Sequence, residues 1–498
     1  MNAQLQSPEA AAAWLQARVS GDLTTNSRKL SVGDGFIAWP GAAVDARQFV
    51  GKALDDGASA CLMEAHDAER FGFSDSRVAT YPDLKGAAAL IAAAYYEHPS
   101  KQLQTVAITG TNGKTSTAWW LANALTVLGH KCGVVGTLGI GAPSAMVFNG
   151  LTTPDPVLLQ RQFRRFVNQG FVACAIEASS IGIAEHRLDA TNIQVAVFTN
   201  FTQDHLDYHA SMEDYWLAKK SLFAWAGLKA AVVNIDDAKG AELSKNLVST
   251  DVDVWTVSCI GAARIEARAV QQGTQSMTFE LVEGEEKYTV SAATLGLFNV
   301  SNLLCVAAAL RALGVSLKEA AQSCTNLPTV PGRLNSIAVA GAPLVVIDYA
   351  HTPDALEKVL LALQPVSAKR QGQLWCVFGC GGDRDTTKRA LMGTAAQKNA
   401  DQIVVTSDNP RSESAETIIR QIASGLIKSD ALHVEPDRAK AIAETIAQAN
   451  SNDVILIAGK GHEDYQEISG IRYPFVDLSH AQAALHARNS ITSGVGAA

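Results

Sequence analysis

The 498-residue chain has no uninterrupted apolar run long enough to cross a bilayer. Its first residues, MNAQLQSPEA, lack both the basic region and the apolar region of a signal peptide. It also has no long block of lysine and arginine, and its net charge is −8. We therefore expect a cytoplasmic protein with no membrane insertion and no nucleic-acid partner, which binds anions only through local sites.

Cysteine is also sparse. The chain has eight cysteines, scattered along its length, and none of them forms a CxxC pair. Reduced and mostly buried cysteines are the default for a cytoplasmic protein, so we expect free thiols.

The composition, 47% hydrophobic and 18% charged, is that of a compact soluble protein with an ample core. At roughly 150 residues per domain, the length predicts about three domains. Polar and proline-containing joints at 98–102 and 327–333 divide the chain into 1–98, 99–331 and 332–498. Short apolar strand candidates alternate with helical patterns in all three parts. This favours the α/β class, with a largely parallel central sheet and a second doubly wound sheet after residue 332.

A glycine-rich turn, GTNGKT at 110–115, follows the predicted strand at 105–108 and leads into a predicted helix. Backbone N–H groups and the helix dipole converge in such a turn, where Lys114 adds a charge for phosphate and Thr115 a hydroxyl for Mg²⁺. The spacing is not the standard G-x-x-x-x-G-K-[ST], because Ile108 stands at the first glycine position. We predict a nucleotide-phosphate site, with an ordinary glycine-rich turn as the alternative.

Two further predicted strands end in polar residues. The strand at 172–177 ends at Glu177, and the strand at 195–199 runs into TNFTQDHLDYH, which contains His205. Ligands of open α/β sheets bind beyond the carboxyl ends of strands, so both side chains are expected beside the phosphate loop. There they can serve Mg²⁺ directly or through a neighbouring ligand. The alternatives are a helix-capping glutamate and a surface histidine.

The stretch TSDNPRSES, 406–414, follows an apolar run that reads as a buried strand. Asp408 and Asn409 favour a turn, Pro410 fixes its own φ, and Arg411 could be merely solvated. The alternative is a site for a molecule that carries both an ammonium and a carboxylate.

Several motifs together resemble the Mur ligase family. They are GTNGKT (110–115), EASS (177–180), TNFTQDHLDYH (199–209), YWLAKK (215–220), LGLFNVSN (295–302), PGR (331–333) and DYAHTPD (348–354). A second set resembles the MurE-type branch: SRKLSVGDGFIAWPG (27–41), GCGGDRD (379–385), DNPR (408–411) and GKGHED (459–464). The resemblance covers almost the whole chain. It implies a uridine-nucleotide-binding module at 1–98, a P-loop ATPase at 99–331 and a Rossmann-like amino-acid-binding domain at 332–498.

Members of this family are ATP-dependent ligases that form amide bonds of the peptidoglycan stem peptide. The resemblance implies that a carboxylate of UDP-MurNAc-L-Ala-D-Glu takes the γ-phosphoryl group of ATP, and that the amine of meso-diaminopimelate then displaces phosphate from the acyl phosphate. Such catalysis depends on charge neutralisation and alignment, so Mg²⁺ is expected. The implied partners are small molecules, the implied state is a monomer, and the implied role lies in cell wall biogenesis, cell shape and cell division.

The resemblance also assigns site residues. The catalytic residues are Lys114, Glu177, His205 and Lys219, and the metal ligands are Thr115, Glu177, His205 and Lys219 as a carbamate. The ATP site comprises Gly110, Thr111, Asn112, Gly113, Lys114, Thr115, Ser116, Asn299, Asn302, Arg333, Asp348 and His351. The last three would reach ATP from across the domain joint, which implies domain closure before chemistry. From the sequence alone, Lys219 reads as a solvated helix cation.

The nucleotide-sugar site is implied to comprise Ser27, Ala42, Ala43, Val44, Asn149, Thr152, Thr153, Ser179, Glu185 and Arg187. Two positions depart from the family pattern. Glu185 stands where glutamine is common, and Ile181 replaces a frequent histidine. The extra negative charge of Glu185 is unexpected beside an anionic substrate.

The diaminopimelate site is implied to comprise Arg384, Asp408, Asn409, Pro410, Arg411, Gly459 and Glu463. Diaminopimelate and lysine both carry a distal ammonium, but only diaminopimelate also carries a distal carboxylate. Arg411 offers a planar fork for that carboxylate, and Asp408 or Glu463 can accept from the ammonium. A site built around a polar partner can reject its absence by up to about 10⁴-fold.

Three alternatives remain. The chain could be a lysine-adding or other Mur ligase, or a folylpolyglutamate-synthase-like ligase, although the stretch at 27–41 argues against the latter. It could also be a nucleotide-gated binding protein without chemistry, but Glu177, His205, Lys219 and the DNPR motif would then be unexplained.

Overall fold

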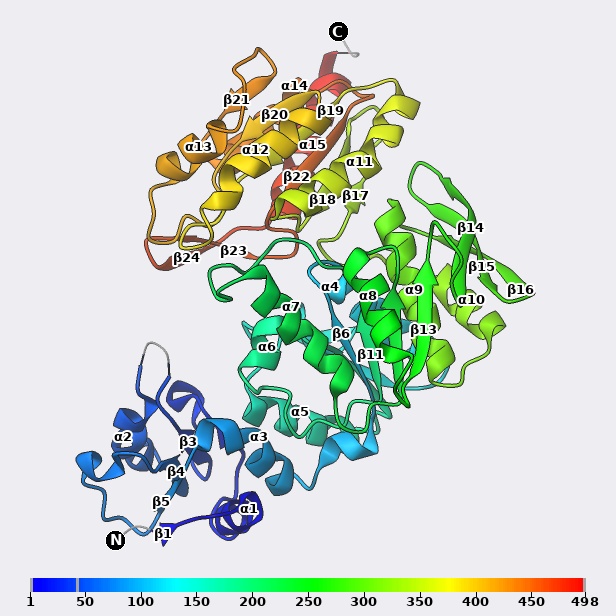
Figure 1. Cartoon of the computed structure of the whole chain (residues 1–498). Helices are drawn as coiled ribbons and strands as arrows, with labels where there is room; N and C mark the ends of the chain where they lie inside the picture. Colours follow the sequence, from blue (N-terminus) through cyan, green and yellow to red (C-terminus); the bar gives the residue numbers. More distant parts are fainter. Residues whose placement is uncertain (1–2, 42–43, 496–498) are drawn as a thin grey trace.

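The computed structural model describes the backbone of residues 3–41 and 44–495, with side chains as far as residue 488. It has three lobes that follow one another along the chain, an N-terminal, a central and a C-terminal one (Figure 1). Ala42 and Ala43, predicted to contact the nucleotide sugar, lie outside the described residues.

The N-terminal lobe is built on a five-stranded parallel sheet in the order β1-β5-β4-β3-β2. Its strands are β1 (Ala3–Gln4), β2 (Leu23–Thr24), β3 (Gly35–Ala38), β4 (Ala60–Glu64) and β5 (Val78–Tyr81). Its helices are α1 (Pro8–Gln16), α2 (Val50–Asp55) and α3 (Leu84–Tyr95), with short 3₁₀ turns η1 (Ser27–Lys29), η2 (Ala46–Phe49) and η3 (Ala68–Phe71). Apolar clusters form on both faces of this sheet, one under α1 and α3 and one under α2.

The central lobe carries an eleven-stranded sheet in the order β16-β15-β14-β13-β12-β11-β6-β10-β7-β8-β9. Its strands are β6 (Gln104–Thr109), β7 (Cys132–Gly136), β8 (Gly139–Ala142), β9 (Ala145–Val147), β10 (Ala173–Glu177), β11 (Val195–Phe198), β12 (Ala230–Asn234), β13 (Asp253–Ser258), β14 (Ile265–Gln272), β15 (Met277–Glu283) and β16 (Glu286–Ala292). Its helices are α4 (Lys114–Val127), α5 (Pro156–Asn168), α6 (Ser180–Ala184), α7 (Met212–Lys220), α8 (Ala238–Leu247), α9 (Leu297–Ala312) and α10 (Leu317–Thr325), with the 3₁₀ turns η4 (Pro99–Gln102) and η5 (Ser221–Ala224).

The middle of the central sheet is parallel and buried on both faces. Along β10, Ala173 and Ala175 face the cluster under α4 and α9, while Cys174 and Ile176 face the cluster under α5 and α7. This near-continuous apolar run is what a parallel strand covered on both faces requires. The prediction of a mostly parallel central sheet is confirmed, with antiparallel additions at both edges, β7-β8-β9 and β14-β15-β16.

The C-terminal lobe has a six-stranded sheet in the order β17-β18-β22-β19-β20-β21, parallel except for β17. Its strands are β17 (Asn335–Ile337), β18 (Leu344–Asp348), β19 (Leu374–Phe378), β20 (Gln402–Val405), β21 (Leu432–Val434) and β22 (Val454–Ala458), and a hairpin adds β23 (Tyr465–Ile468) and β24 (Ile471–Pro474). Its helices are α11 (Pro353–Arg370), α12 (Thr387–Asn399), α13 (Ala415–Ala423), α14 (Arg438–Gln448) and α15 (Asp477–Val495). Helices cover both faces, so the doubly wound prediction is confirmed.

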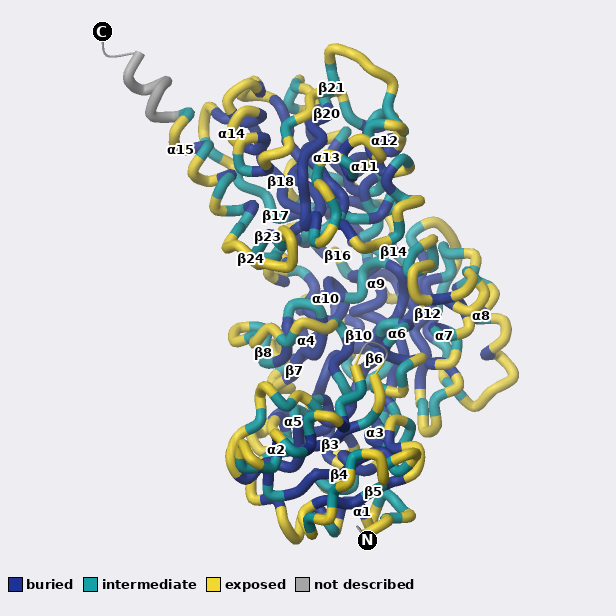
Figure 2. Tube along the Cα trace, turned by 90° about the vertical axis from the view of Figure 1, so that its left-hand side faces the viewer, coloured by how far each residue is buried: buried dark blue, intermediate teal, exposed yellow. Residues whose placement is uncertain are grey.

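Burial follows the same plan in every lobe, with the strands buried and the outer helix faces and loops exposed (Figure 2). All eight cysteines are free, and all but the partly exposed Cys259 are buried, as predicted. Within the described residues, no helix is long and apolar enough to cross a membrane. The exact boundaries at 98 and 331 stay a prediction.

Candidate active site

The phosphate loop connects the carboxyl end of β6 to the first turn of α4 and is held tightly against its neighbours. Gly110 has φ +146° and Gly113 has φ +87°, conformations that favour glycine. A Cβ on Gly110 would collide with the hydroxyl of Thr199, and one on Gly113 with the amide of Asn302. Both glycines are therefore required by backbone conformation and by close approach.

Lys114 is the first residue of α4 and lies folded over the loop. Its Nζ donates to the carbonyl oxygens of Gly110 at 2.9 Å and Thr111 at 2.8 Å. Burial lowers the pKa of Lys114, while Glu177 and Asp204 oppose that shift. These bonds hold the ammonium at the phosphate loop, where it can pair with a phosphate oxygen.

Glu177 ends β10 and is 1% exposed. Its carboxylate accepts from the hydroxyl of Thr115 at 2.9 Å, and from the backbone N–H of Thr137 at 2.7 Å and its hydroxyl at 3.2 Å. Thr137, which follows β7, was not among the predicted site residues. Its place after a parallel strand of the same sheet is the one sequence signal for its contact with Glu177. Since β10 lies beside β6 in the sheet, the structure brings Glu177 and Thr115 together.

His205 lies in the loop after β11 with φ +55°, in the left-handed region. Its Nε2 is 3.6 Å from a carboxylate oxygen of Asp204, and its ring lies edge-on to Tyr215, 5.9 Å between centroids. Burial lowers the pKa of His205, and the nearby ammonium groups of Lys114 and Lys219 lower it further. A neutral imidazole with a lone pair can bind a metal ion.

Lys219 lies near the end of α7 and is only 1% exposed, so the solvated-cation interpretation is wrong. Its Nζ donates to the carbonyl of Gly110 at 2.9 Å and lies 4.3 Å from the centroid of the Tyr215 ring. Burial, followed by the charge of Lys114, brings the pKa of Lys219 well below its usual value. The α7 helix thus carries this amine into the phosphate loop.

A pocket opens between the phosphate loop, α9 and the start of the C-terminal lobe. It is lined by Asn112, Gly113, Ser116, Asn200, Phe298, Asn299, Asn302, Arg333, Asp348, Tyr349, Ala350, His351, Ala355, Lys358 and Val359. It therefore contains Asn299, Asn302, Arg333, Asp348 and His351, which lie far apart in the sequence, next to the glycine-rich turn. Apolar side chains and convergent polar groups of this kind suit a nucleotide.

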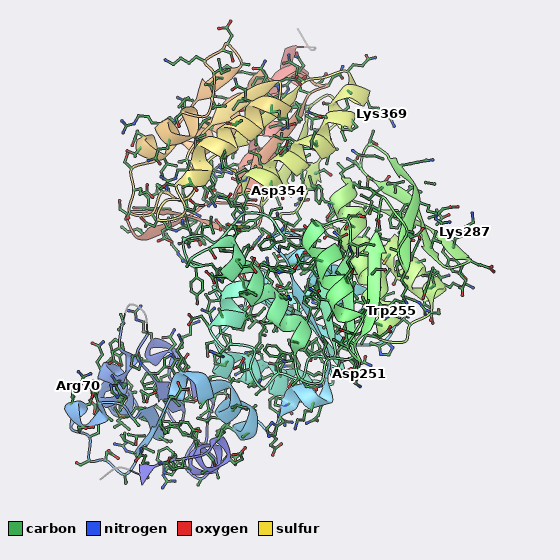
Figure 3. The ribbon with its side chains drawn as sticks, in the orientation of Figure 1. Arg70, Asp251, Trp255, Lys287, Asp354 and Lys369 are labelled. Carbon is green, nitrogen blue, oxygen red and sulfur yellow. The ribbon has the colours of Figure 1, made fainter. Side chains whose placement is uncertain are left out.

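Direct contacts join the lobes at this pocket. Arg333 Nη2 donates to Thr115 Oγ1 at 3.2 Å, and its guanidinium lies 4.5 Å from the Tyr349 ring centroid. Asn112 Nδ2 donates to Asp354 at 3.0 Å, and Asp354 lies where the C-terminal lobe faces the central one (Figure 3). The sequence analysis did not assign Asp354, although it belongs to the motif at 348–354.

Buried groups around Asp348 give the pocket its shape. The Asp348 carboxylate accepts from the backbone N–H groups of Leu334 and Ala350, each at 2.8 Å, and burial raises its pKa. His351 Nδ1–H donates to the Tyr349 carbonyl at 2.9 Å, and burial lowers the pKa of His351 to about 4. Thr352 caps α11 beside them by accepting from Ala355 N–H at 3.3 Å.

Four of the residues predicted to hold the nucleotide sugar, Thr152, Thr153, Ser179 and Arg187, lie close to one another near Glu177. Thr153 Oγ1 donates to the Glu177 carbonyl at 2.6 Å and lies 2.9 Å from Ser179 Oγ. Arg187 Nη1 donates to the Thr153 carbonyl at 2.9 Å, and the hydroxyls of Thr137 and Thr152 are 3.0 Å apart. Asn149, which was also predicted for this site, precedes Thr152 and Thr153 in the chain. The predicted Ser27 and Val44 lie in the N-terminal lobe.

Glu185, the departure from the family pattern, has other partners. Its carboxylate lies 2.7 Å from Lys85 Nζ on α3 and accepts from the Tyr208 hydroxyl at 2.5 Å. The hydrogen bonds from Lys85 and Tyr208 lower the pKa of Glu185. The extra negative charge is thus compensated by a lysine of the N-terminal lobe.

The DNPR segment follows β20, and its first three residues are buried. Arg411 has φ +53° and is bound to the β23–β24 hairpin: its N–H donates to Glu467 O at 2.9 Å, and Ser469 N–H donates to its carbonyl at 2.7 Å. Its Nη1 donates to Gly382 O at 2.7 Å. A Cβ on the predicted Gly459 would lie 2.5 Å from Asp408 Oδ2, so Gly459 permits the approach of Asp408.

Arg384 lies near Arg411, since a Cβ added to Gly381 would be 2.8 Å from Arg411 Nη1 and 3.9 Å from Arg384 Cγ. Its Nη1 donates only to Asp383 O at 3.1 Å among the described residues. An open cavity there is lined by Leu206, Asp207, Asp383, Arg384, Asp385 and Thr386. The cavity places Arg384 opposite the loop that carries His205, between the phosphate side and the DNPR side of the joint.

Within the described residues, no three of the histidine, cysteine, aspartate and glutamate side chains are grouped to hold a metal ion. Mg²⁺ is commonly held by one or two carboxylates together with phosphate oxygens and water, and keeps no complete protein cage. The Thr115 hydroxyl and the Glu177 carboxylate, 2.9 Å apart beside the phosphate loop, fit this mode of binding.

The fold and the site together define a three-domain α/β protein that binds a nucleotide through a phosphate loop at a domain joint. The family model described as Mur ligase middle domain matches residues 108–310, and the model described as Mur ligase, glutamate ligase domain, matches residues 332–461. The chain belongs to the Mur ligase family.

Individual relatives agree along nearly the full length. A protein of Acidovorax sp. (strain JS42) named UDP-N-acetylmuramoyl-L-alanyl-D-glutamate--2,6-diaminopimelate ligase is 54% identical, over 96% of this chain and 97% of its own. A protein of the same name from Janthinobacterium sp. (strain Marseille) is 45% identical, over 95% of this chain and 96% of its own. A solved structure of a ligase of that name is 34% identical with a TM-score of 0.65, and the match covers 94% of this chain and 95% of that one.

Proposed function

We propose that this Mur ligase uses ATP to join meso-diaminopimelate to UDP-MurNAc-L-Ala-D-Glu in the synthesis of peptidoglycan precursors. The similarity of the whole chain to ligases named for that reaction carries the proposal. The arrangement of the site supports it, because the central lobe supplies a phosphate loop with a pocket beside it, and the C-terminal lobe supplies a cluster of side chains with charges of both signs.

The first step is transfer of the γ-phosphoryl group to a substrate carboxylate. Lys114 neutralises charge on that group, and Arg333 reaches it from across the joint, where it already contacts Thr115. Asn299, Asn302, Asp348 and His351 shape the nucleotide pocket. Mg²⁺, when bound by Thr115 and Glu177 and, at a second position, by His205 and carbamylated Lys219, would supply further neutralisation of phosphate charge.

The second step is attack of the amine on the acyl phosphate. Thr152, Thr153, Ser179 and Arg187 would hold the nucleotide-sugar peptide behind Glu177. Arg411 and Arg384 would receive the distal carboxylate of diaminopimelate, and Asp408 and Glu463 its ammonium. Since the two pockets belong to different lobes, we infer that the lobes close further to align amine and acyl phosphate.

The net charge of −8 and the absence of a basic block support small-molecule partners without nucleic acid. We propose a cytoplasmic monomer. The principal alternative is a lysine-adding Mur ligase, whose substrate would leave Arg411 without a carboxylate.

Phosphate release measured with UDP-MurNAc-L-Ala-D-Glu and a panel of amino acids tests the proposal. We expect ATP turnover that requires both the acceptor and meso-diaminopimelate, with lysine a poor substitute. Turnover with lysine at equal or higher kcat/KM would overturn the substrate assignment. ATP hydrolysis that ignores both substrates would overturn the ligase assignment.

A further inference from the structure

A buried lysine lies among the residues of the predicted diaminopimelate site, and none of the motifs assigned it a role. Lys460 follows β22 and is fully buried, with 0% of its side chain exposed. Its Nζ donates to Asn409 Oδ1 at 3.0 Å and to Glu463 Oε2 at 3.1 Å, and lies 3.8 Å from Asp408 Oδ1. It therefore lies beside both carboxylates that were expected to accept the substrate ammonium, Asp408 and Glu463, and beside Asn409 of the same predicted site.

The same contacts fix the side chain of Asn409. Its Oδ1 accepts from Lys460 and also from the backbone N–H of Glu467 at 2.9 Å, while its Nδ2 donates to Glu463 at 2.8 Å. Its oxygen therefore already accepts two hydrogen bonds from within the protein. Asn409 serves as a bridge between Lys460, Glu463 and the hairpin that anchors Arg411.

The charges give the cluster a definite balance. Asp408 and Glu463 contribute two negative charges and Lys460 one positive charge, which leaves one negative charge for a ligand. Arg411 adds a positive charge at the far side of the DNPR turn. The distal end of diaminopimelate carries one ammonium and one carboxylate, so it matches one uncompensated acid and one arginine. A lone ammonium such as that of lysine matches less well.

We propose that Lys460 is a positioning residue that determines amino-acid specificity, because it offsets one of the two carboxylates and orients Asn409 and Glu463. This inference rests on the proposed function and deepens it. Without Lys460, two carboxylates would face one substrate ammonium, and the pocket would bind a proton or a second cation instead.

The protonation of Glu463 gives a specific readout. Burial and the neighbouring Asp408 raise the pKa of Glu463, and Lys460 opposes the shift. Three other titratable groups interact electrostatically with Glu463: Tyr349 after β18, Tyr465 on β23 and Arg438 on α14. Removing Lys460 therefore raises the pKa of Glu463 further. The acidic limb of kcat/KM for diaminopimelate moves to higher pH, since protonated Glu463 no longer accepts from the ammonium.

The test compares Lys460→Met, Glu463→Gln and the double variant with wild type, using phosphate release with diaminopimelate and with lysine from pH 5 to 9. Lys460→Met should lower kcat/KM for diaminopimelate at least about tenfold, as loss of a charge-assisted hydrogen bond does, and move the acidic limb to higher pH. The KM for ATP should stay within about twofold, and the ratio of lysine to diaminopimelate use should rise.

The double variant has again one negative charge and should recover activity relative to Lys460→Met. A purely structural lysine predicts additive losses and an unmoved acidic limb, and either result would overturn the proposal. Lys460→Arg keeps the positive charge, so its acidic limb of kcat/KM should lie at the wild-type pH even if its activity is low. This variant tests the proposal if Lys460→Met does not fold. Lys398→Met, which removes an exposed lysine of the same lobe, is the matched control. If wild type itself does not use diaminopimelate, the proposed function fails, whatever the variants do.

Discussion

Lys114 and Lys219 donate hydrogen bonds to the same oxygen, the carbonyl of Gly110, each at 2.9 Å. Two ammonium groups on one acceptor repel each other, and both lie in the low-dielectric surroundings of the phosphate loop. Burial and this repulsion bring the pKa of Lys219 well below its usual value. Lys219 is thus the one of the pair that is more readily neutral, and a neutral amine is the form that reacts with carbon dioxide.

The first prediction concerns this amine. Lys219 should carry a carbamate in the working enzyme, because the added carboxylate removes the repulsion and offers oxygen to Mg²⁺. Lys219→Ala should lose most of its ligase activity and regain part of it with short carboxylic acids such as acetate. Phosphate release with and without acetate measures this, and a ¹³C carbamate signal after labelling with bicarbonate is an independent check. Lys220→Ala, the adjacent lysine, is the control; equal rescue of both variants would contradict the assignment.

The second prediction concerns Lys114. Lys114→Ala should abolish product formation, since Lys114 is the one positively charged residue of the loop at 110–115. The fold should persist, because the lysine bonds only to carbonyls of its own loop. Product assays together with circular dichroism and thermal unfolding test both parts. A folded variant with near-normal ligation would refute the assignment of the phosphate loop.

The third prediction concerns Arg411. Arg411→Ala should raise the KM for diaminopimelate at least about tenfold, because a charge-assisted hydrogen bond is worth about 1.5–3 kcal/mol. The KM for ATP should change little, since the proposed ATP site is the pocket beside the phosphate loop, whose lining does not include Arg411. Lysine should remain a poor substrate or improve slightly.

Steady-state kinetics with both amino acids measure these changes, and Arg420→Ala, on the exposed face of α13, is the control. The prediction fails if Arg411→Ala raises the KM for ATP as much as the KM for diaminopimelate.

The fourth prediction concerns Glu185 and its partner Lys85, 2.7 Å apart across the lobes. Both side chains are partly exposed, so Glu185→Gln should cost less than about 1 kcal/mol of unfolding free energy. The KM for the nucleotide-sugar substrate should stay the same or fall, because a negative charge near an anionic ligand is removed. A rise of tenfold or more would mean that Glu185 contacts the substrate directly.

The fifth prediction concerns pH. Burial lowers the pKa of His351 and of His462 to about 4, below the usual value of 6.5. Between these two values the unfolded chain binds more protons than the folded one, so folding stability falls as pH drops from 6.5 towards 4. Each histidine contributes up to about 3 kcal/mol to this loss. His462→Gln should flatten the curve of unfolding free energy against pH below 6.5, whereas the exposed His186→Gln should not.

Local patterns in the sequence determined most of the fold class. Largely apolar runs at 105–108, 374–378 and 454–458 are buried parallel strands, because a strand covered on both faces needs a continuous apolar run. The edge strands β14, β15 and β16 escaped prediction. Their residues alternate between buried and exposed, and such short alternations are weak signals beside polar loops.

The sequence also determined the chemistry that the chain can perform, since glycine-rich turns, acids at strand ends and the DNPR turn are contiguous motifs. Only the tertiary structure decided which of these groups meet. Arg333 contacts Thr115 across 218 positions of sequence, and Glu177 reaches Thr115 because β10 and β6 are neighbours in a sheet whose order differs from chain order. The burial of Lys219 and Lys460 likewise depends on how helices and loops pack. A lysine in a sequence carries the same charge wherever it lies, and only its surroundings decide whether that charge is solvated or set against a neighbour.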